Sequence, residues 1–359
     1  MAGAVAQPAA RRRSRLAPAT RGAVTTAAGA APELDELRRL IDQAGPHVEH
    51  RIAGRSVDGR ELHVVALGTA DPAFPAIGFF AGVHGLERIG VQVVTSYLRT
   101  VVERLRWDAT AERELAHVRL VFMPLVNPGG LALGTRANPN GVDLMRNAPL
   151  DADGHVPWLV GGQRISAGLP WYRGPAGAPL EAESRALCEV VETELLPRPF
   201  ALALDCHSGF GMIDRIWFPY AHTRRPIRHL AEVHALTGIF ERSHAHHRYV
   251  IEPQSRNYLA HGDLWDWLYR RAAAREAVFL PLTLEMGSWS WVRKNPRQLL
   301  RRDGLFNPLV EHRVQRVLRR HVTWLDFLVR AAASHARWSP RDAARDRETT
   351  HALQRWYGR

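Results

Sequence analysis

The amino-acid sequence predicts a single α/β domain in which helices cover both faces of one sheet. Short apolar runs typical of strands alternate with segments of helical periodicity along the 359-residue chain, and this alternation is the pattern of α/β proteins. The apolar runs are rich in Val, Leu, Phe and Ala, as expected for strands buried on both faces. Neither an internal repeat nor a long Gly-, Ser- or Pro-rich linker divides the body of the chain.

Each predicted element follows from the spacing of its apolar residues. Continuous apolar runs predict strands, and apolar residues at three- and four-residue intervals predict helices. In chain order, the sequence predicts a helix at 32–45, strands at 61–68 and 76–82, a helix at 88–106, a strand at 118–126, a helix at 179–195, strands at 201–207 and 215–221, a helix at 262–276, a strand at 278–285 and a helix at 307–333. Residues 127–147 are dense in Gly, Asn and Pro and are predicted to be a loop.

The net charge of +12 is concentrated at the two ends of the chain. Residues 1–30 carry five arginines and no acid, and residues 334–359 carry six arginines and three acids. We therefore predict a disordered Arg-rich tail at 1–30, a folded domain at 31–333 and a charged tail at 334–359. The body keeps only +4, which does not favour nucleic acid as a partner.

Cysteine content and hydropathy bear on the compartment. Cys188 and Cys206 are the only cysteines, which is typical of a reducing compartment. The N-terminus lacks the apolar stretch of a secretory signal, so we expect a cytoplasmic protein, with an organelle transit peptide as the alternative. No run of eighteen apolar residues is present, so we expect no membrane span.

The stretch FFAGVHGLERIGVQ places His84 and Glu87 where a strand gives way to a helix. Residues three apart on a helical turn share a face, so the two side chains could bind one metal ion. The spacing alone is weak evidence. A glutamate at a helix start is also favoured by the helix dipole, and a histidine beside it can simply lie on the surface.

A third candidate ligand lies in the stretch ALALDCHSGFG. Side chains alternate along a strand, so Asp205 and His207 point to one side and Cys206 to the other. A catalytic zinc usually takes three protein ligands from His, Glu or Asp, and His207 would complete the set. The alternative is a strand-end histidine that donates to a backbone carbonyl.

A carboxylate interrupts the apolar strand VFLPLTLEMGSW. Glu285 stands where a buried strand should carry no charge, because burying an unpaired carboxylate is costly. Beside a metal-bound water, such a group can take a proton and later deliver it to a leaving amine. A structural ion pair with an arginine is the alternative.

Two other segments carry side chains that bear on a metal site. The loop 127–147 contains Arg136 and Arg146, and guanidinium groups near a metal can polarise a carbonyl or clamp a carboxylate. The stretch RSHAHHRYV is a rival metal cluster. No strand or helix spacing brings its histidines together, so we interpret it as a solvated loop; they are His244, His246 and His247.

Taken in order, these motifs resemble those of the zinc metallocarboxypeptidases of the carboxypeptidase A/B type. That family has H-x-x-E, a loop with R and GVD-x-N-R-N, a strand ending in H-S, a tyrosine, and a strand ending in E. This chain has HGLE, TRANPNGVDLMRN, DCHSG, NYLAHGDLWDW and LTLE over roughly residues 50–330. The ordered set carries the resemblance, which implies a mixed sheet of about eight strands sandwiched between helices.

The resemblance implies a catalytic role for five residues. His84, Glu87 and His207 would hold one zinc ion per chain. Glu285 would be the general base and acid that activates the zinc-bound water. Arg136 would polarise the scissile carbonyl and steady the oxyanion.

The resemblance also implies how substrate would be held. Arg146 would grip the terminal carboxylate, Tyr258 would close over the bound substrate, and Asp143 would orient His84. Two positions depart from the family pattern. Met145 replaces an asparagine that helps to bind the terminal carboxylate, and Leu86 replaces an arginine common in digestive-type members.

The residues that would select the substrate side chain are ambiguous. Trp265 aligns with the floor of the family's specificity pocket, and Asp263 lies two residues before it. A bulky floor would suit a small side chain, whereas Asp263 would favour a basic one, and the sequence leaves both open.

These observations lead to three functional hypotheses. The first is a zinc-dependent metallocarboxypeptidase that hydrolyses a peptide or peptide-like amide bond. The second, motivated by Met145, is an amidohydrolase or deacylase of the same fold that acts on N-acyl amino acids or cell-wall peptides. The third is a non-enzymatic protein that binds partners through its basic tails or through a degenerate site.

Overall fold

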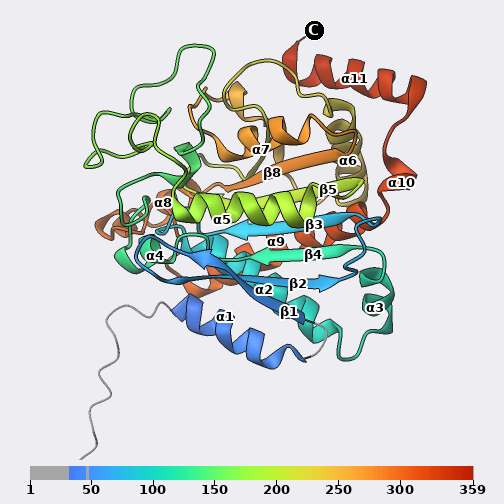
Figure 1. Ribbon diagram of the computed structural model, residues 1–359, viewed down its shortest axis with the longest axis horizontal. Helices are drawn as coiled ribbons and strands as arrows, with labels where there is room; N and C mark the ends of the chain where they lie inside the picture. Colours follow the sequence, from blue (N-terminus) through green and yellow to red (C-terminus); the bar gives the residue numbers. More distant parts are fainter. Residues whose placement is uncertain (1–31, 46–47, 359) are drawn as a thin grey trace, which may run out of the picture.

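The computed structural model describes residues 32–45 and 48–358. An eight-stranded mixed sheet runs through the centre of the protein, in the order β1-β2-β4-β3-β5-β8-β6-β7 (Figure 1). Its strands are β1 (Val48–Arg55), β2 (Glu61–Gly68), β3 (Ala76–Ala81), β4 (Arg119–Met123), β5 (Phe200–Ser208), β6 (Arg215–Phe218), β7 (Val250–Pro253) and β8 (Val278–Met286). The mixed eight-stranded sheet confirms the predicted fold class.

The centre of the sheet is parallel. Strand β3 pairs in parallel with β4 and with β5, and β5 pairs in parallel with β8. Every residue of β3, β4 and β5 is buried, as expected for strands covered on both faces. Because β3, β5 and β8 are parallel neighbours, their carboxyl ends meet at one edge of the sheet.

Helices and short helical turns surround the sheet. They are α1 (Pro32–Gln43), α2 (Arg88–Arg104), α3 (Ala109–Leu115), α4 (Pro128–Leu133), η2 (Leu144–Arg146), α5 (Ala182–Val190), η3 (Val191–Leu195), α6 (Leu230–Ser243), η4 (Gln254–Arg256), α7 (Leu264–Ala272), α8 (Trp289–Lys294), η5 (Pro296–Leu300), α9 (Glu311–Ala333), α10 (His335–Trp338) and α11 (Asp342–Tyr357). Helices α2 and α9 pack together on one face of β3 and β5, while α5 and α7 lie on the other face (Figure 1).

The elements that the sequence did not predict are mostly polar or short. Strand β1 is an edge strand with mainly exposed side chains, so it lacks the apolar run used to recognise a strand. Strand β7 has four residues. Helix α4 lies inside the predicted loop 127–147. It begins where Asn127 caps the amide of Gly130 at 2.8 Å and Pro128 occupies the first turn.

The predicted charged tail at 334–359 is wrong for the described residues up to 358, because they form α10 and α11. Helix α11 packs against α6. The indole of Trp356 is buried against the Phe218 ring and donates to the Ile251 carbonyl at 2.7 Å. Some charges of the segment pair with α6, as between Arg345 and Glu232 at 3.0 Å. The predicted tail at 1–30 lies outside the described residues. No helix in the described part of the chain is long and apolar enough to cross a bilayer.

Candidate metal and active site

The candidate site lies at the edge where the parallel strands end. His84 and Glu87 follow β3 directly, His207 is the penultimate residue of β5, and Glu285 is the penultimate residue of β8. In the register of the sheet, His207 and Glu285 are direct neighbours. The topology therefore brings together four side chains that are far apart in sequence.

The turn that carries His84 and Glu87 is held by close packing. A Cβ at Gly85 would lie 2.0 Å from the carbonyl carbon of Gly130 in α4, so only glycine fits. Asn307, just before α9, donates to the Leu86 carbonyl at 2.8 Å and accepts from the Ile89 amide at 2.9 Å. No local sequence pattern indicated Asn307, because its partners lie more than two hundred residues earlier in the chain.

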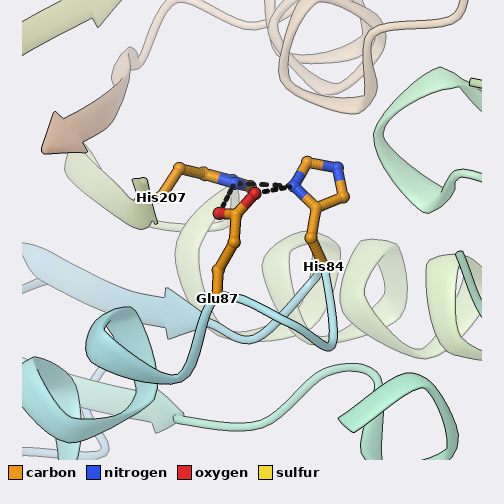
Figure 2. Close-up of side chains that lie close together, drawn as sticks. All are labelled: His84, Glu87 and His207. Atoms are coloured by element: carbon orange, nitrogen blue, oxygen red, sulfur yellow. Dashed lines mark hydrogen bonds and ion pairs between the residues drawn. The ribbon is translucent and has the colours of Figure 1, made fainter. Parts of the chain in front are cut away.

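The three candidate ligands converge on one point (Figure 2). The Nδ1 atom of His84 lies 2.8 Å from Glu87 Oε1, and the Nδ1 atom of His207 lies 3.1 Å from Glu87 Oε2. The two Nδ1 atoms are 3.2 Å apart. All three side chains are buried.

Each histidine is held from behind by a carboxylate. His84 Nε2 lies 3.1 Å from Asp143 Oδ1, and His207 Nε2 lies 2.7 Å from Asp205 Oδ2. Because a carboxylate only accepts, both Nε2 atoms must carry hydrogen, and this turns both Nδ1 atoms toward the cluster as acceptors. The indole of Trp265 donates to the same Asp205 oxygen at 2.9 Å.

This donor set fits a zinc ion. Two imidazole nitrogens and a carboxylate that face one another at about 3 Å repel unless protons or a metal cation lie between them. Tetrahedral zinc with bonds of 2.0–2.1 Å places neighbouring ligand atoms about 3.3 Å apart, close to the observed separation of the two Nδ1 atoms. Two histidines with one glutamate are also a common ligand set of catalytic zinc.

The charges around the cluster favour its ionised form. Burial alone would raise the pKa of Glu87, but His84 and His207 overcome this effect and hold the pKa below its ordinary value. Burial likewise opposes ionisation of Asp143, yet Arg136 and His84 hold its pKa well below the ordinary value. The site thus presents ionised carboxylates to any bound cation.

Glu285 differs from these carboxylates. Burial, followed by the charge of Glu87, raises its pKa to about 8. Its Oε1 atom accepts from the Phe210 amide at 3.0 Å, and no arginine forms an ion pair with it among the described residues. The structural ion pair considered for Glu285 is therefore absent there. A cation bound beside it would stabilise the ionised form and lower this pKa.

A cavity of about 300 Å³ opens onto the cluster. Seven of the residues that the sequence singled out line it: His84, Glu87, Arg136, Arg146, His207, Tyr258 and Glu285. Its volume is at the lower end of the range for small-ligand pockets.

The two arginines of the cavity have different partners. Arg136 donates through Nε to Asp143 at 2.8 Å and lies 3.5 Å from Glu87. Arg146 is 3% exposed, yet no ion pair joins it to a carboxylate within the described chain. Its nearest polar contacts are long, including Tyr258 Oη at 3.4 Å. A buried guanidinium without a carboxylate is suited to receive one from a ligand.

Asp263 and Met145 also line the cavity, but Trp265 does not. Trp265 packs against Phe80 and donates to Asp205, so its predicted place at the pocket floor is wrong. Burial and the neighbouring Asp266 raise the pKa of Asp263 to about 7. The cavity therefore contains a second titratable acid.

The rival histidine segment does not form a metal site. His84, Glu87 and His207 make the only group of potential metal ligands found within residues 32–45 and 48–358. His244 and His247 instead pack against the Phe240 ring at the end of α6.

Comparison with known proteins agrees with this geometry. The profile of the zinc carboxypeptidase family matches residues 35–291, and the chain therefore belongs to this family. This confirms the resemblance found in the sequence and the enzyme class it implied, and it identifies zinc as the metal of the family.

The curated proteins that match this chain are only distantly similar to it in sequence. The chain is 34% identical over 115 residues to murein peptide amidase A of Escherichia coli (strain K12), covering 31% of this chain and 41% of the relative. It is 27% identical over 187 residues to the carboxypeptidase N catalytic chain of Rattus norvegicus, covering 46% and 38% respectively. Each match spans less than half of the curated relative.

The similarity in fold covers more of the chain than the similarity in sequence. The crystal structure of carboxypeptidase A from Helicoverpa armigera superposes with a TM-score of 0.61 at 19% identity, covering 84% of this chain and 72% of that one. This likeness establishes the fold alone.

Proposed function

We propose that this protein is a zinc-dependent metallocarboxypeptidase that hydrolyses a peptide or peptide-like amide bond. One zinc ion per chain would be held by His84, Glu87 and His207. The observation that carries the proposal is the convergence of these ligand atoms beside Glu285, inside a cavity that also contains a buried arginine without a carboxylate partner. Bound zinc would supply Lewis acidity toward the scissile carbonyl and the attacking water.

Glu285 would move the protons. Because Glu285 is the neighbour of His207 in the sheet, a water that attacks beside the metal ligands would lie within its reach. Its carboxylate takes a proton from the water and returns it to the leaving nitrogen. The Phe210 amide donates to Glu285 Oε1, so Oε2 is the oxygen that would carry the proton.

Arg136 and Arg146 would orient the substrate. Arg136 is fixed by Asp143, so its guanidinium can stabilise negative charge that develops on the carbonyl oxygen. Arg146 and the hydroxyl of Tyr258, 3.4 Å apart, would bind the carboxylate of the terminal residue.

The two cysteines are buried and unpaired, in agreement with the cytoplasm as the proposed compartment.

The test combines metal analysis with hydrolysis of N-blocked dipeptides. Glu285→Gln should keep one zinc per chain and lose roughly 10²–10⁴-fold in kcat. His207→Ala should lose both zinc and activity. Near wild-type turnover by Glu285→Gln would refute the proposed proton transfer, and a folded wild type without zinc would refute the metal site.

Cell-wall peptides are the second candidate substrate class. Met145 lines the cavity where the family has a carboxylate-binding asparagine, and Asp263 adds an acid that could meet an amino group. The relative named murein peptide amidase supports this direction. Murein peptides with a terminal diamino acid should then be preferred over simple dipeptides. Amidation of the terminal carboxylate separates the two candidates, because only a strict carboxypeptidase loses its substrate.

A further inference from the structure

A basic and apolar surface segment borders the active-site cavity. Residues 293–302, with the sequence RKNPRQLLRR, contain five cationic side chains and no acid. We refer to them as the basic–apolar segment. It runs from the end of α8 through η5, at the left of Figure 1, and the proposed hydrolysis does not use it.

The segment is anchored to the cavity wall on both sides. Before it, the indole of Trp289 donates to the Gly209 carbonyl at 2.8 Å and its ring lies 5.8 Å from that of Phe210, which lines the cavity. After it, Leu305 and Phe306 line the same cavity. The basic–apolar segment is thus part of the rim around the entrance.

The backbone holds two leucines outward. Leu299 is 57% exposed and Leu300 is 89% exposed. Beneath them, the buried Gln298 side chain donates to the Gly304 carbonyl at 2.5 Å, which closes the loop. A Cβ at Gly304 would lie 1.8 Å from the Gln298 carbonyl oxygen, so the loop is tightly packed. The leucines therefore cannot turn inward without breaking this packing.

Most of the cations on the segment have no acidic partner. Arg301 pairs with Asp303 at 3.2 Å. The other four form no ion pair with any described residue, and all are exposed: Arg293, Lys294, Arg297 and Arg302. By contrast, Arg345 and Arg355 of α11 pair with acids of α6. Four cations without an acidic partner therefore lie within a few residues of the two exposed leucines.

Further apolar surface adjoins the segment. Trp289 is 44% exposed, and its amide donates to the Gly211 carbonyl at 3.0 Å. The next two residues of that loop, Met212 and Ile213, are 38% and 53% exposed. An aromatic residue, protruding aliphatic residues and free cations are the combination found on proteins that bind the interface of a bilayer.

We propose that the basic–apolar segment docks the protein onto an anionic lipid surface. Leu299 and Leu300 would enter the acyl region, while the free cations meet the lipid phosphates. Single-stranded nucleic acid fits less well, because its bases need aromatic rings to stack on and the tip is aliphatic. A second copy of the chain would bring like charges together. This role goes beyond the proposed function and does not depend on it.

Co-sedimentation with vesicles tests the proposal. Full-length protein should bind vesicles of phosphatidylglycerol and phosphatidylcholine in equal parts, and not phosphatidylcholine alone. Added salt should weaken binding. The double variants Leu299→Ser/Leu300→Ser and Arg297→Gln/Arg302→Gln should each reduce binding roughly tenfold or more. Activity on a small substrate should be unchanged.

Matched variants separate the segment from general charge and hydrophobicity. Trp107 is 76% exposed and lies between α2 and α3 in the chain. Helix α3 is at the right of Figure 1 and α8 at the left. Trp107→Ser should therefore bind as wild type does. The double variant Arg113→Gln/Arg270→Gln removes two exposed arginines, one on α3 and one on α7. It should lose little of the vesicle binding. Equal binding by all variants would assign binding to another cationic part of the chain and overturn the proposal. A dimer in sedimentation velocity that is lost in Leu299→Ser/Leu300→Ser would overturn it in favour of self-association.

Discussion

Replacing Asp205 by asparagine should weaken zinc binding while leaving the fold intact. Asp205 is fully buried, and its Oδ2 atom accepts both from His207 Nε2 at 2.7 Å and from the Trp265 indole at 2.9 Å. Its Oδ1 atom has no hydrogen-bond partner among the described residues. An asparagine oxygen at the Oδ2 position can keep both hydrogen bonds, so the substitution removes mainly the negative charge.

The charge determines how strongly His207 binds a cation. Burial alone would lower the pKa of His207, but Asp205 and Glu87 raise it well above the ordinary value. A more basic imidazole is a stronger zinc ligand, and loss of such a supporting carboxylate typically costs about 10- to 100-fold in metal affinity. Trp265→Phe removes one hydrogen bond to the Asp205 carboxylate but keeps its charge, so its effect on zinc affinity should be smaller than that of Asp205→Asn.

Competition with a chromogenic chelator at fixed pH measures these affinities directly. Circular dichroism and thermal unfolding of the zinc-free variants show whether the fold is kept. Asp143→Asn is a less selective variant, because Asp143 also holds Arg136 at 2.8 Å. If Asp205→Asn bound zinc as tightly as wild type, the carboxylate behind His207 would have no role in the metal site.

Three further predictions concern the acid in the cavity, the interior and the C-terminal helix. Asp263 has a pKa of about 7, so it should favour substrates with a terminal amino group only above that pH. Asp263→Asn should abolish this pH dependence of kcat/KM and lower kcat/KM for such substrates by about 10- to 100-fold. The pKa of buried His321 is lowered to about 4, so its stabilising effect is complete above pH 6.5 and is lost toward pH 4, by roughly 3 kcal/mol. Urea unfolding at pH 7 and pH 5 should show the loss, and His321→Asn should reduce it; equal losses in both proteins would contradict the assignment. Trp356→Ala should lower the free energy of unfolding by about 3–5 kcal/mol, because α11 loses its buried anchor; a change under 1 kcal/mol would show that α11 contributes little.

The sequence predicted the centre of the sheet better than its edges. Strand β2 lies where the sequence predicted it, and β3, β5 and β8 differ by a residue or two at their ends, because their apolar runs are continuous. Strands β1 and β7 were missed because an edge strand can be polar or short and still pair with its neighbour. The C-terminal charges suggested a solvated tail, and only the structure shows that α6 provides partners for Arg345 and Arg355.

The candidate site was predictable to the extent that it is local. His84, Glu87, His207 and Glu285 were found because each is a polar residue at the end of an apolar run. Residues that support the site from a distance were not found. Asn307 holds the turn of His84 from the segment just before α9, and no local pattern indicates which turn an asparagine will reach. The role of Trp265 was missed for the same reason.

We propose that the substrate preference depends on Arg146 and Asp263, two groups of opposite charge that line the cavity. Arg146 and Asp263 are held together by backbone contact, since the amide of Ala148 donates to the Gly262 carbonyl at 3.0 Å and a Cβ at Gly262 would meet the Arg146 carbonyl oxygen at 1.9 Å. Neither Arg146 nor Asp263 forms an ion pair with any described residue. A ligand that neutralises only Arg146 leaves a buried acid near the bound carboxylate, whereas one with both a carboxylate and an amine satisfies both groups. The loss of the family's asparagine at Met145 weakens recognition of the carboxylate alone. On this proposal, the remaining charges would favour a terminal residue that carries an additional amino group.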